Sequence, residues 1–324
     1  MSVLRWDREE ARRVGVPAVL SSLDGATAVV LDGVEAADEK WLGWCRRAPC
    51  PVLAVVDGGV GPACVDVVLD RRDADQLEHL IGRITARPGA SRVLVDVLRV
   101  VDGLDVARAL VVESLAYSAL LAGPEFAAWL ARRGEWRSRD ERGDPVRLER
   151  LDRELRIVLD RPASRNAMSA EMRDGLLEAL TVAELDESIE HVVLSGAGPS
   201  FSSGGHLGEF GTTPDVVRAH DIRLRRSVGA VLARLAPRTT VVLHGTSAGA
   251  GVELAAFAGR VVARPGTELL LPEHDLGLIP GAGGTVSLTR RIGRQATARL
   301  VLSGRVIGVD EALALGLVDE LAEP

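Results

Sequence analysis

Residues 240–263 read TVVLHGTSAGAGVELAAFAGRVVA, and the fold class follows from this stretch. The short β-branched run at 240–243 predicts a strand ending at Gly245, and the small residues from Gly249 to Gly259 predict a helix. Apolar runs at 261–263 and 269–271 predict two further strands. Strands that alternate with helices indicate an α/β layered domain.

The same alternation precedes this stretch. Apolar runs at 155–159 and 191–195 predict two strands. The apolar spacing at 169–180 predicts a helix between them, with Ser169 as its cap. The triplet at 213–215 combines a capping residue, a proline and an acid, so it predicts a helix that continues through Val228.

The front half has a different pattern. Its one strand-like run is at 52–56, and helical spacing recurs at 74–86, 90–100, 104–122 and 124–133. A charged stretch with glycine and proline at 132–145 has the composition of a linker. We therefore expect a mostly helical N-terminal region at 1–140 and an α/β domain at 149–324.

Composition excludes several classes of function. The 324 residues carry a net charge of −7, and Lys40 is the only lysine, so a basic footprint for nucleic acid is absent. No apolar run reaches the ~18 residues of a membrane span, and the N-terminus does not resemble a signal peptide. We expect a cytoplasmic protein without nucleic-acid or membrane partners. Three cysteines without paired spacing predict buried, reduced thiols, and the histidines show no metal-ligand spacing.

Three glycine-rich turns, at 202–207, 245–251 and 280–284, follow or adjoin predicted strands. Two such turns can direct backbone N–H groups at one oxygen, as an oxyanion hole requires. Glu253 and Glu273 lie beside these turns, and paired carboxylates around one water can act as general acid and base. The alternative is a structural role for each glutamate, with Arg260 and Arg264 as nearby partners.

From about Leu155 to Leu321, the sequence resembles the crotonase (enoyl-CoA hydratase/isomerase) superfamily. Five ordered motifs carry the resemblance, at residues 159–168, 201–207, 249–254, 271–285 and 312–319.

The resemblance implies a crotonase-like spiral of β-β-α turns that binds an acyl-CoA. By motif position, the amides of Gly205 and Ala250 would hold the thioester oxygen. Glu253 and Glu273, 20 residues apart, match the two glutamates that hold water in the hydratases of the family. Hydration of a 2-enoyl-CoA in fatty acid metabolism is therefore expected. Glu253 would help to activate the water, and Glu273 would supply the proton at the α carbon.

Further site residues follow from the same resemblance. Ser203, His206 and Leu207 are expected beside the substrate, and Arg161 and Arg165 are candidates for the phosphates of coenzyme A. Coenzyme A would enter as part of the substrate, with no other cofactor and no metal. The family also implies a homotrimer or a dimer of trimers.

Two positions depart from the family pattern. His206 stands where the family usually has an aspartate, and Ala250 stands where it usually has a glycine. Alanine at 250 keeps the backbone N–H but adds a methyl group. These departures leave a non-catalytic binding protein as one alternative. Double-bond isomerisation, thioester hydrolysis or decarboxylation of an acyl-CoA are others. The sequence around Ser247 also matches G-x-S-x-G, the nucleophile elbow of serine hydrolases.

Family members usually continue with helices beyond the motif at 316–319, whereas this sequence ends at Pro324. The helical patterns of the front half resemble those helices. We hypothesise that the helical cap precedes the core, through permutation or as the remnant of a first copy in a fused pair. This hypothesis predicts that residues 73–133 pack on the core at 150–321.

Overall fold

The computed structural model describes residues 2–7, 25–33, 39–59, 61–135 and 143–322. Its N-terminal part is a four-stranded parallel sheet in the order β1-β2-β3-β4. The elements are β1 (Ser2–Trp6), β2 (Ala26–Asp32), α2 (Glu39–Arg47), β3 (Val52–Val56) and β4 (Val67–Asp70). The strand expected at 52–56 is confirmed, but the expectation of a single strand in the front half is wrong. Buried parallel strands are continuous apolar runs, whose periodicity does not separate them from helix.

Four helices follow this sheet at the positions that the periodicity predicts. They are α3 (Ala74–Ala86), α4 (Pro88–Val101), α5 (Val106–Leu121) and α6 (Pro124–Arg133). Half of the predicted linker at 132–145, residues 136–142, lies outside the described residues, and α6 occupies its first two positions. No single described helix has the length and apolar content to cross a membrane, although α5 and α6, bent by 63°, together meet that test by length and composition.

The C-terminal part is built on a six-stranded sheet in the order β13-β10-β8-β7-β6-β5, in which only β5 is antiparallel to its neighbour. Its strands are β5 (Val146–Leu151), β6 (Glu154–Leu159), β7 (His191–Gly196), β8 (Thr239–Leu243), β10 (Arg260–Ala263) and β13 (Glu320–Leu321). A smaller sheet contains β9 (Thr246–Ala248), β11 (Glu268–Leu270) and β12 (Ile307–Gly308). The sequence predictions for β6, β7, β8, β10 and β11 are confirmed.

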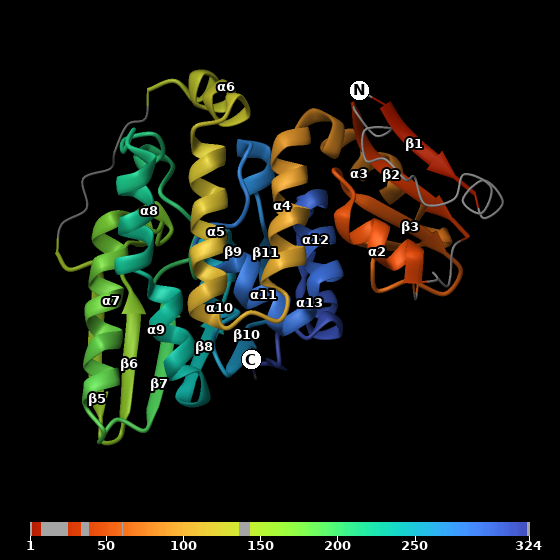
Figure 1. Ribbon diagram of the computed structural model, residues 1–324. Coiled ribbons are helices and arrows are strands. Elements are labelled where there is room, and N and C mark those ends of the chain that lie inside the picture. The colour runs from red at the N-terminus through yellow and green to blue at the C-terminus, as the bar shows by residue number, and fades with distance from the viewer. Residues whose placement is uncertain (1, 8–24, 34–38, 60, 136–142, 323–324) are drawn as a thin grey trace.

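Helices cover these sheets (Figure 1). They are α7 (Ala170–Leu185), α8 (Val216–Arg225), α9 (Val228–Leu235), α10 (Ala250–Ala255), α11 (Gly284–Ile292), α12 (Arg294–Ser303) and α13 (Val309–Leu315). The single helix expected from residue 213 through Val228 is instead two helices. Asp215 caps the first and Ser227 the second, each by accepting backbone N–H bonds.

The front helices pack directly on the C-terminal core of the same chain. Helix α5 packs against α8, α9 and α11, α4 packs against α11 and α12, and α3 packs against α12. One apolar cluster runs from β2 and β3 through α4 and α5 to the interior of the large sheet. The predicted packing of residues 73–133 on the core is therefore confirmed, and Figure 1 shows α4 and α5 across the middle of the molecule.

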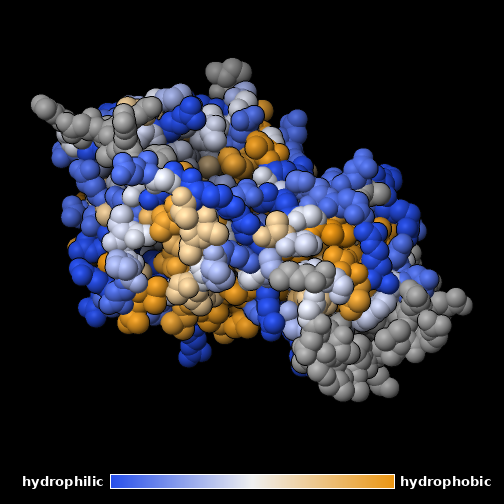
Figure 2. Space-filling model, turned by 90° about the horizontal axis from the view of Figure 1, so that it is seen from above, coloured by the Kyte–Doolittle hydropathy of each residue, from blue (hydrophilic) through white to orange (hydrophobic). Residues whose placement is uncertain are grey.

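The outer face of the N-terminal sheet has a smaller core of its own, closed by α2 and containing Trp44. Cys45, Cys50 and Cys64 are free and buried in it, as expected. Seen from above, the molecular surface has apolar patches separated by hydrophilic side chains (Figure 2).

Candidate active site

Two glycine-rich loops meet side by side in the C-terminal core. Ser202 pairs with Ser247 as an isolated bridge, and the N–H of Ala248 donates to the carbonyl of Ser202 over 2.9 Å. A Cβ at Gly204 would lie 2.8 Å from the carbonyl oxygen of Ala248, so only glycine permits this close approach. The structure thus brings together the two turns that the sequence predicts to share a ligand.

The predicted oxyanion donors lie at the edge of this contact. Gly205 pairs with Met168 as an isolated bridge, and Ala250 is the first residue of α10, directly after Gly249 at φ +45°. Within the described residues, neither the Gly205 amide nor the Ala250 amide donates to another protein atom. An oxyanion hole requires N–H donors without a protein acceptor, and these two amides meet that requirement within the described residues.

Glu253 lies one turn into α10 and is 2% exposed. Its Oε2 accepts the N–H groups of Ala282, over 2.7 Å, and Gly284, over 2.9 Å. Burial, together with the negative charges of Glu273 and Glu113, raises the pKa of Glu253 well above its usual value. The structural alternative holds in part, because Glu253 makes these two hydrogen bonds, whereas the nearby Arg260 pairs with Glu320 instead.

Glu273 begins the 3-10 turn Glu273–Leu276 that follows β11. It is 9% exposed, its Oε1 lies against Gly249, and its Oε2 has no hydrogen-bond partner among the described residues. Burial, with the charge of Glu113 acting in the same direction, raises the pKa of this carboxyl to about 7. An unpartnered buried oxygen is costly unless a ligand or water completes it.

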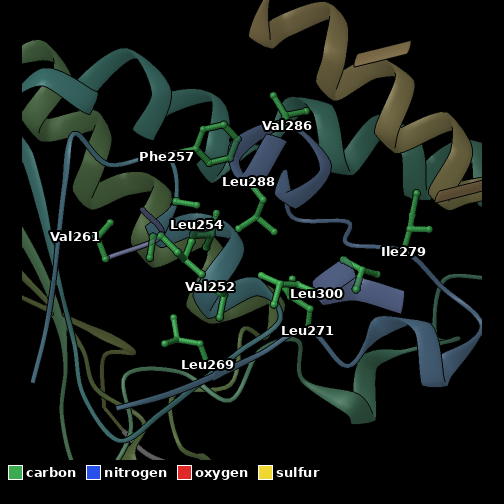
Figure 3. Close-up of a cluster of buried hydrophobic side chains, with 14 of the residues drawn as sticks. Val252, Leu254, Phe257, Val261, Leu269, Leu271, Ile279, Val286, Leu288 and Leu300 are labelled. Carbon is green, nitrogen blue, oxygen red and sulfur yellow. The ribbon is translucent and has the colours of Figure 1, made fainter. Parts of the chain in front are cut away.

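Both glutamates come from segments that contribute to the apolar core. Val252 and Leu254 are the neighbours of Glu253 in sequence, Leu271 lies two residues before Glu273, and all three belong to the buried cluster that Figure 3 shows. In such surroundings a carboxylate loses the water that stabilises its charge. The neutral acid is therefore favoured over a wider pH range than in solution.

A third carboxylate, Glu113, comes from α5 in the front half. Its Oε1 accepts the N–H of Gly283 over 2.8 Å, while Oε2 accepts the N–H of Thr285 over 2.9 Å and its hydroxyl over 2.7 Å. Glu113 is 2% exposed, and burial raises its pKa to about 7. The loop at 281–285 is thus held by Glu253 on one side and by Glu113 on the other.

Sequence reasoning missed Glu113. A signal was present, because Ala109, Leu110, Glu113 and Ser114 lie on one buried face of α5 at helical spacing. A glutamate on an apolar helix face requires a partner or a function. The sequence did not show that the partner is a loop 170 residues further on.

The other predicted substrate-binding residues line the first loop. The Ser203 hydroxyl donates to the carbonyl of Ser164 over 3.2 Å, and the N–H of His206 donates to the carbonyl of Met168 over 3.1 Å. The carbonyl of Leu207 accepts a bond from Arg133 of α6. The front helices therefore hold this loop as well as the loop at 281–285.

The structure separates the two arginines predicted to meet phosphates. Arg161 is 6% exposed and donates to the carbonyl of Gly143 over 2.6 Å and to Glu171 over 3.1 Å, so its guanidinium has protein partners already. This geometry favours a structural role for Arg161. Arg165 is exposed on the loop after β6, and its contact with a phosphate stays a prediction.

The serine-hydrolase alternative is wrong. Ser247 is fully buried on β9, and its hydroxyl has no hydrogen-bond partner among the described residues. The histidine that follows it in sequence, His274, instead contacts the hydroxyl of Ser91 through Nε2 over 2.8 Å. A serine nucleophile needs an adjacent base, and no base in the described part of the chain contacts this hydroxyl.

The two glycine-rich loops and the buried carboxylates thus lie together in the α/β core. The family model for enoyl-CoA hydratase/isomerase matches residues 155–323. The 2,3-dehydroadipyl-CoA hydratase of Escherichia coli (strain K12) is 34% identical over 174 residues, which are 54% of this chain and 68% of that protein. The chain belongs to the enoyl-CoA hydratase/isomerase family, a family of enzymes that process acyl-CoA thioesters.

Solved structures agree in fold. An enoyl-CoA hydratase from Thermoplasma volcanium GSS1 superposes with a TM-score of 0.51 at 32% identity, covering 56% of this chain and 73% of that one. A structure from Thermobifida fusca YX in complex with acetoacetyl-CoA gives a TM-score of 0.50 at 26% identity, over 55% and 73%. The crotonase-like fold is thereby confirmed. The chain spans about two thirds of the length of the curated relatives it matches.

Proposed function

We propose that this protein hydrates a 2-enoyl-CoA thioester. The observation that carries the proposal is the pair of buried carboxylates, Glu253 and Glu273, beside two loops with uncommitted amides. The free Oε2 of Glu273 supports it further, because a water or a substrate proton would complete that atom. The name of the Escherichia coli relative is consistent with hydration rather than isomerisation.

The reaction assigns a separate task to each carboxylate. Glu253, as the carboxylate, accepts a proton from water while the water oxygen bonds to the β carbon of the enoyl group. The π electrons move toward the thioester, and the resulting enolate takes a proton at the α carbon from Glu273. Glu253 is fixed for this role, because two N–H donors hold its Oε2 and leave Oε1 for the water.

Charge accumulates on the thioester oxygen during this step. N–H donors that already point at that oxygen stabilise the enolate without reorganisation, and the loss of one such donor typically costs about 3–4 kcal/mol. We assign these donors to Gly205 and Ala250, whose amides have no protein acceptor among the described residues. Alanine at position 250 serves as well as glycine, since the donor is the backbone.

The remaining assignments rest on the sequence composition and on the family resemblance. We propose that coenzyme A arrives as part of the substrate and that no other cofactor or metal takes part. We also propose a cytoplasmic protein that assembles as a homotrimer or a dimer of trimers.

The test is the loss of enoyl absorbance on hydration of a short 2-enoyl-CoA. We expect Glu253→Gln and Glu273→Gln each to lower kcat by about 10²–10⁴-fold, since each removes one proton-transfer group. Glu268→Gln is the matched control, because Glu268 is exposed on β11 close in sequence to Glu273. Hydration that survives both glutamine substitutions would refute the paired-carboxylate mechanism.

A further inference from the structure

A cavity of about 120 Å³ lies between α5, α7, α8 and α9 and ends on the loop at 281–283. Figure 1 shows these four helices grouped on one side of the molecule. The apolar residues Leu110, Val228 and Leu254 line part of the cavity. Three arginines, Arg173, Arg223 and Arg226, also line it, which is unusual for a pocket that receives a plain hydrocarbon chain.

This cavity adjoins the candidate active site. Glu113 and Ala282 both line it, and the N–H of Ala282 donates to Oε2 of Glu253. Met168 lines the opposite side and pairs with Gly205, one of the two predicted oxyanion donors. An acyl chain with its thioester at Gly205 would therefore run past Met168 into the cavity.

The charges in the cavity do not balance. Asp174 pairs with both Arg173, over 2.8 Å, and Arg226, over 2.9 Å, so one carboxylate serves two guanidinium groups. Arg223 is half-buried, and within the described ranges no carboxylate lies within ion-pair distance of it. Its hydrogen bonds go to the hydroxyl and carbonyl of Ser114 and to the hydroxyl of Ser118.

Glu113, whose side chain lines the cavity, does not form an ion pair with Arg223. Both of its oxygens are engaged by Gly283 and Thr285, and burial raises its pKa to about 7. Three guanidinium groups thus line the cavity, and two of them share one carboxylate, that of Asp174. Arg223 is also held in place, with its guanidinium 4.8 Å from the ring centre of Tyr117.

We propose that this cavity binds the far end of the acyl chain and that this end carries a carboxylate, bound by Arg223 with Arg173 and Arg226 beside it. The inference rests on the proposed function, because it places the thioester at Gly205 and Ala250. A guanidinium presents paired donors that match a carboxylate, and a partly desolvated arginine without a counterion gains most from such a partner. The apolar residues of the cavity accommodate the methylene chain between the two ends.

The same arginines could in principle meet the phosphates of coenzyme A, which share the chemistry of a carboxylate. The experiment separates the two sources with pairs of saturated acyl-CoA probes. The members of each pair have the same chain of four, six or eight carbons and differ only in a terminal carboxylate or methyl group. Both members carry the same phosphates, so only binding of the acyl end distinguishes them.

We expect calorimetric titration of the intact protein to show about tenfold or tighter binding of the carboxylated member for at least one chain length. This preference should shrink as salt is raised. Arg223→Gln should abolish it and leave the Kd of the methyl member within about twofold, and Arg226→Gln should reduce it. Arg225→Gln is the control, because Arg225 lies on the same helix, pairs with Asp221 and does not line the cavity.

Equal Kd values for the carboxylated and methyl probes at every chain length would overturn the inference. It would also be overturned if Arg223→Gln weakened the binding of both probes equally, because that result would indicate phosphate binding. If Arg223→Gln does not fold, the preference of the unmodified protein and its reduction in Arg226→Gln decide the matter. Saturated probes also separate the two proposals. Hydration without a carboxylate preference removes only the inference, whereas the preference without hydration removes only the proposed reaction.

Discussion

At the scale of single residues, Gly249 determines where Glu273 lies. Its φ of +45° belongs to the left-handed region, and a Cβ there would overlap Oε1 of Glu273. We expect Gly249→Ala to lower kcat for hydration at least about tenfold, since it displaces the carboxylate that we assign as proton donor. Backbone strain should also lower the free energy of unfolding by about 1–2 kcal/mol.

Gly266→Ala is the control for that strain. Gly266 has φ +78° in an exposed turn, and no atom lies within 4 Å of the Cβ that alanine would add. It should lose similar stability and keep its activity, as thermal unfolding and the hydration assay would show. Full activity in Gly249→Ala would contradict the position that we give to Glu273.

At the scale of elements, helices α5 and α11 are joined by Glu113. Burial raises the pKa of this carboxyl from an ordinary value of 4.5 to about 7. Between those values the folded protein binds more protons than the unfolded chain does. The contribution of Glu113 to the free energy of unfolding is therefore fully present below pH 4.5 and is lost as the pH rises through about 7. We expect Glu113→Gln to flatten the decline of Tm over this range, as measured by thermal unfolding at a series of pH values.

Glu253 and Glu273 add declines of the same sign, so part of the slope should remain in that variant. The control is Glu178→Gln, since Glu178 is exposed on α7 and should leave the slope unchanged. An unchanged slope in Glu113→Gln would mean that Glu113 does not titrate between these pH values.

At the scale of the whole molecule, a buried ion cluster joins the two parts of the chain. Asp66, which is fully buried, accepts from Arg99 of α4 over 2.5 Å and from Arg294 at the start of α12 over 2.9 Å. It also accepts the N–H of Val52 on β3 over 2.8 Å. We expect Asp66→Asn to lower the free energy of unfolding by about 3–5 kcal/mol. It leaves Arg294 without a carboxylate partner among the described residues, and it leaves Arg99 only the more distant Asp96, at 3.5 Å.

Chemical denaturation measures this loss, with Arg5→Gln as the control. Arg5 pairs with Glu78 at the surface, and an exposed pair is worth at most about 1 kcal/mol. A loss of similar size in both variants would mean that the two parts are held together mainly by apolar contacts.

Most of the elements could be predicted from local pattern. Helices α3 to α6 lie within about two residues of the predicted ranges, because apolar spacing and capping are encoded by neighbouring residues. The strands β1, β2 and β4 were missed, since short parallel strands have no alternation to distinguish them. Arg161 was predicted to bind phosphate, because nothing local showed that Glu171 and the carbonyl of Gly143 already engage it.

The sequence alone indicated the α/β class from alternating strands and helices, and it marked two glycine loops and the candidate carboxylates Glu253 and Glu273. The family resemblance, carried by short motifs, then implied the crotonase-like fold. Only the tertiary structure brought Glu113 to the loop at 281–285 and three arginines to one cavity. Those contacts join residues up to 172 positions apart, and they depend on which faces of the helices pack together. No local periodicity encodes that choice, since it is decided by the burial of the whole apolar core.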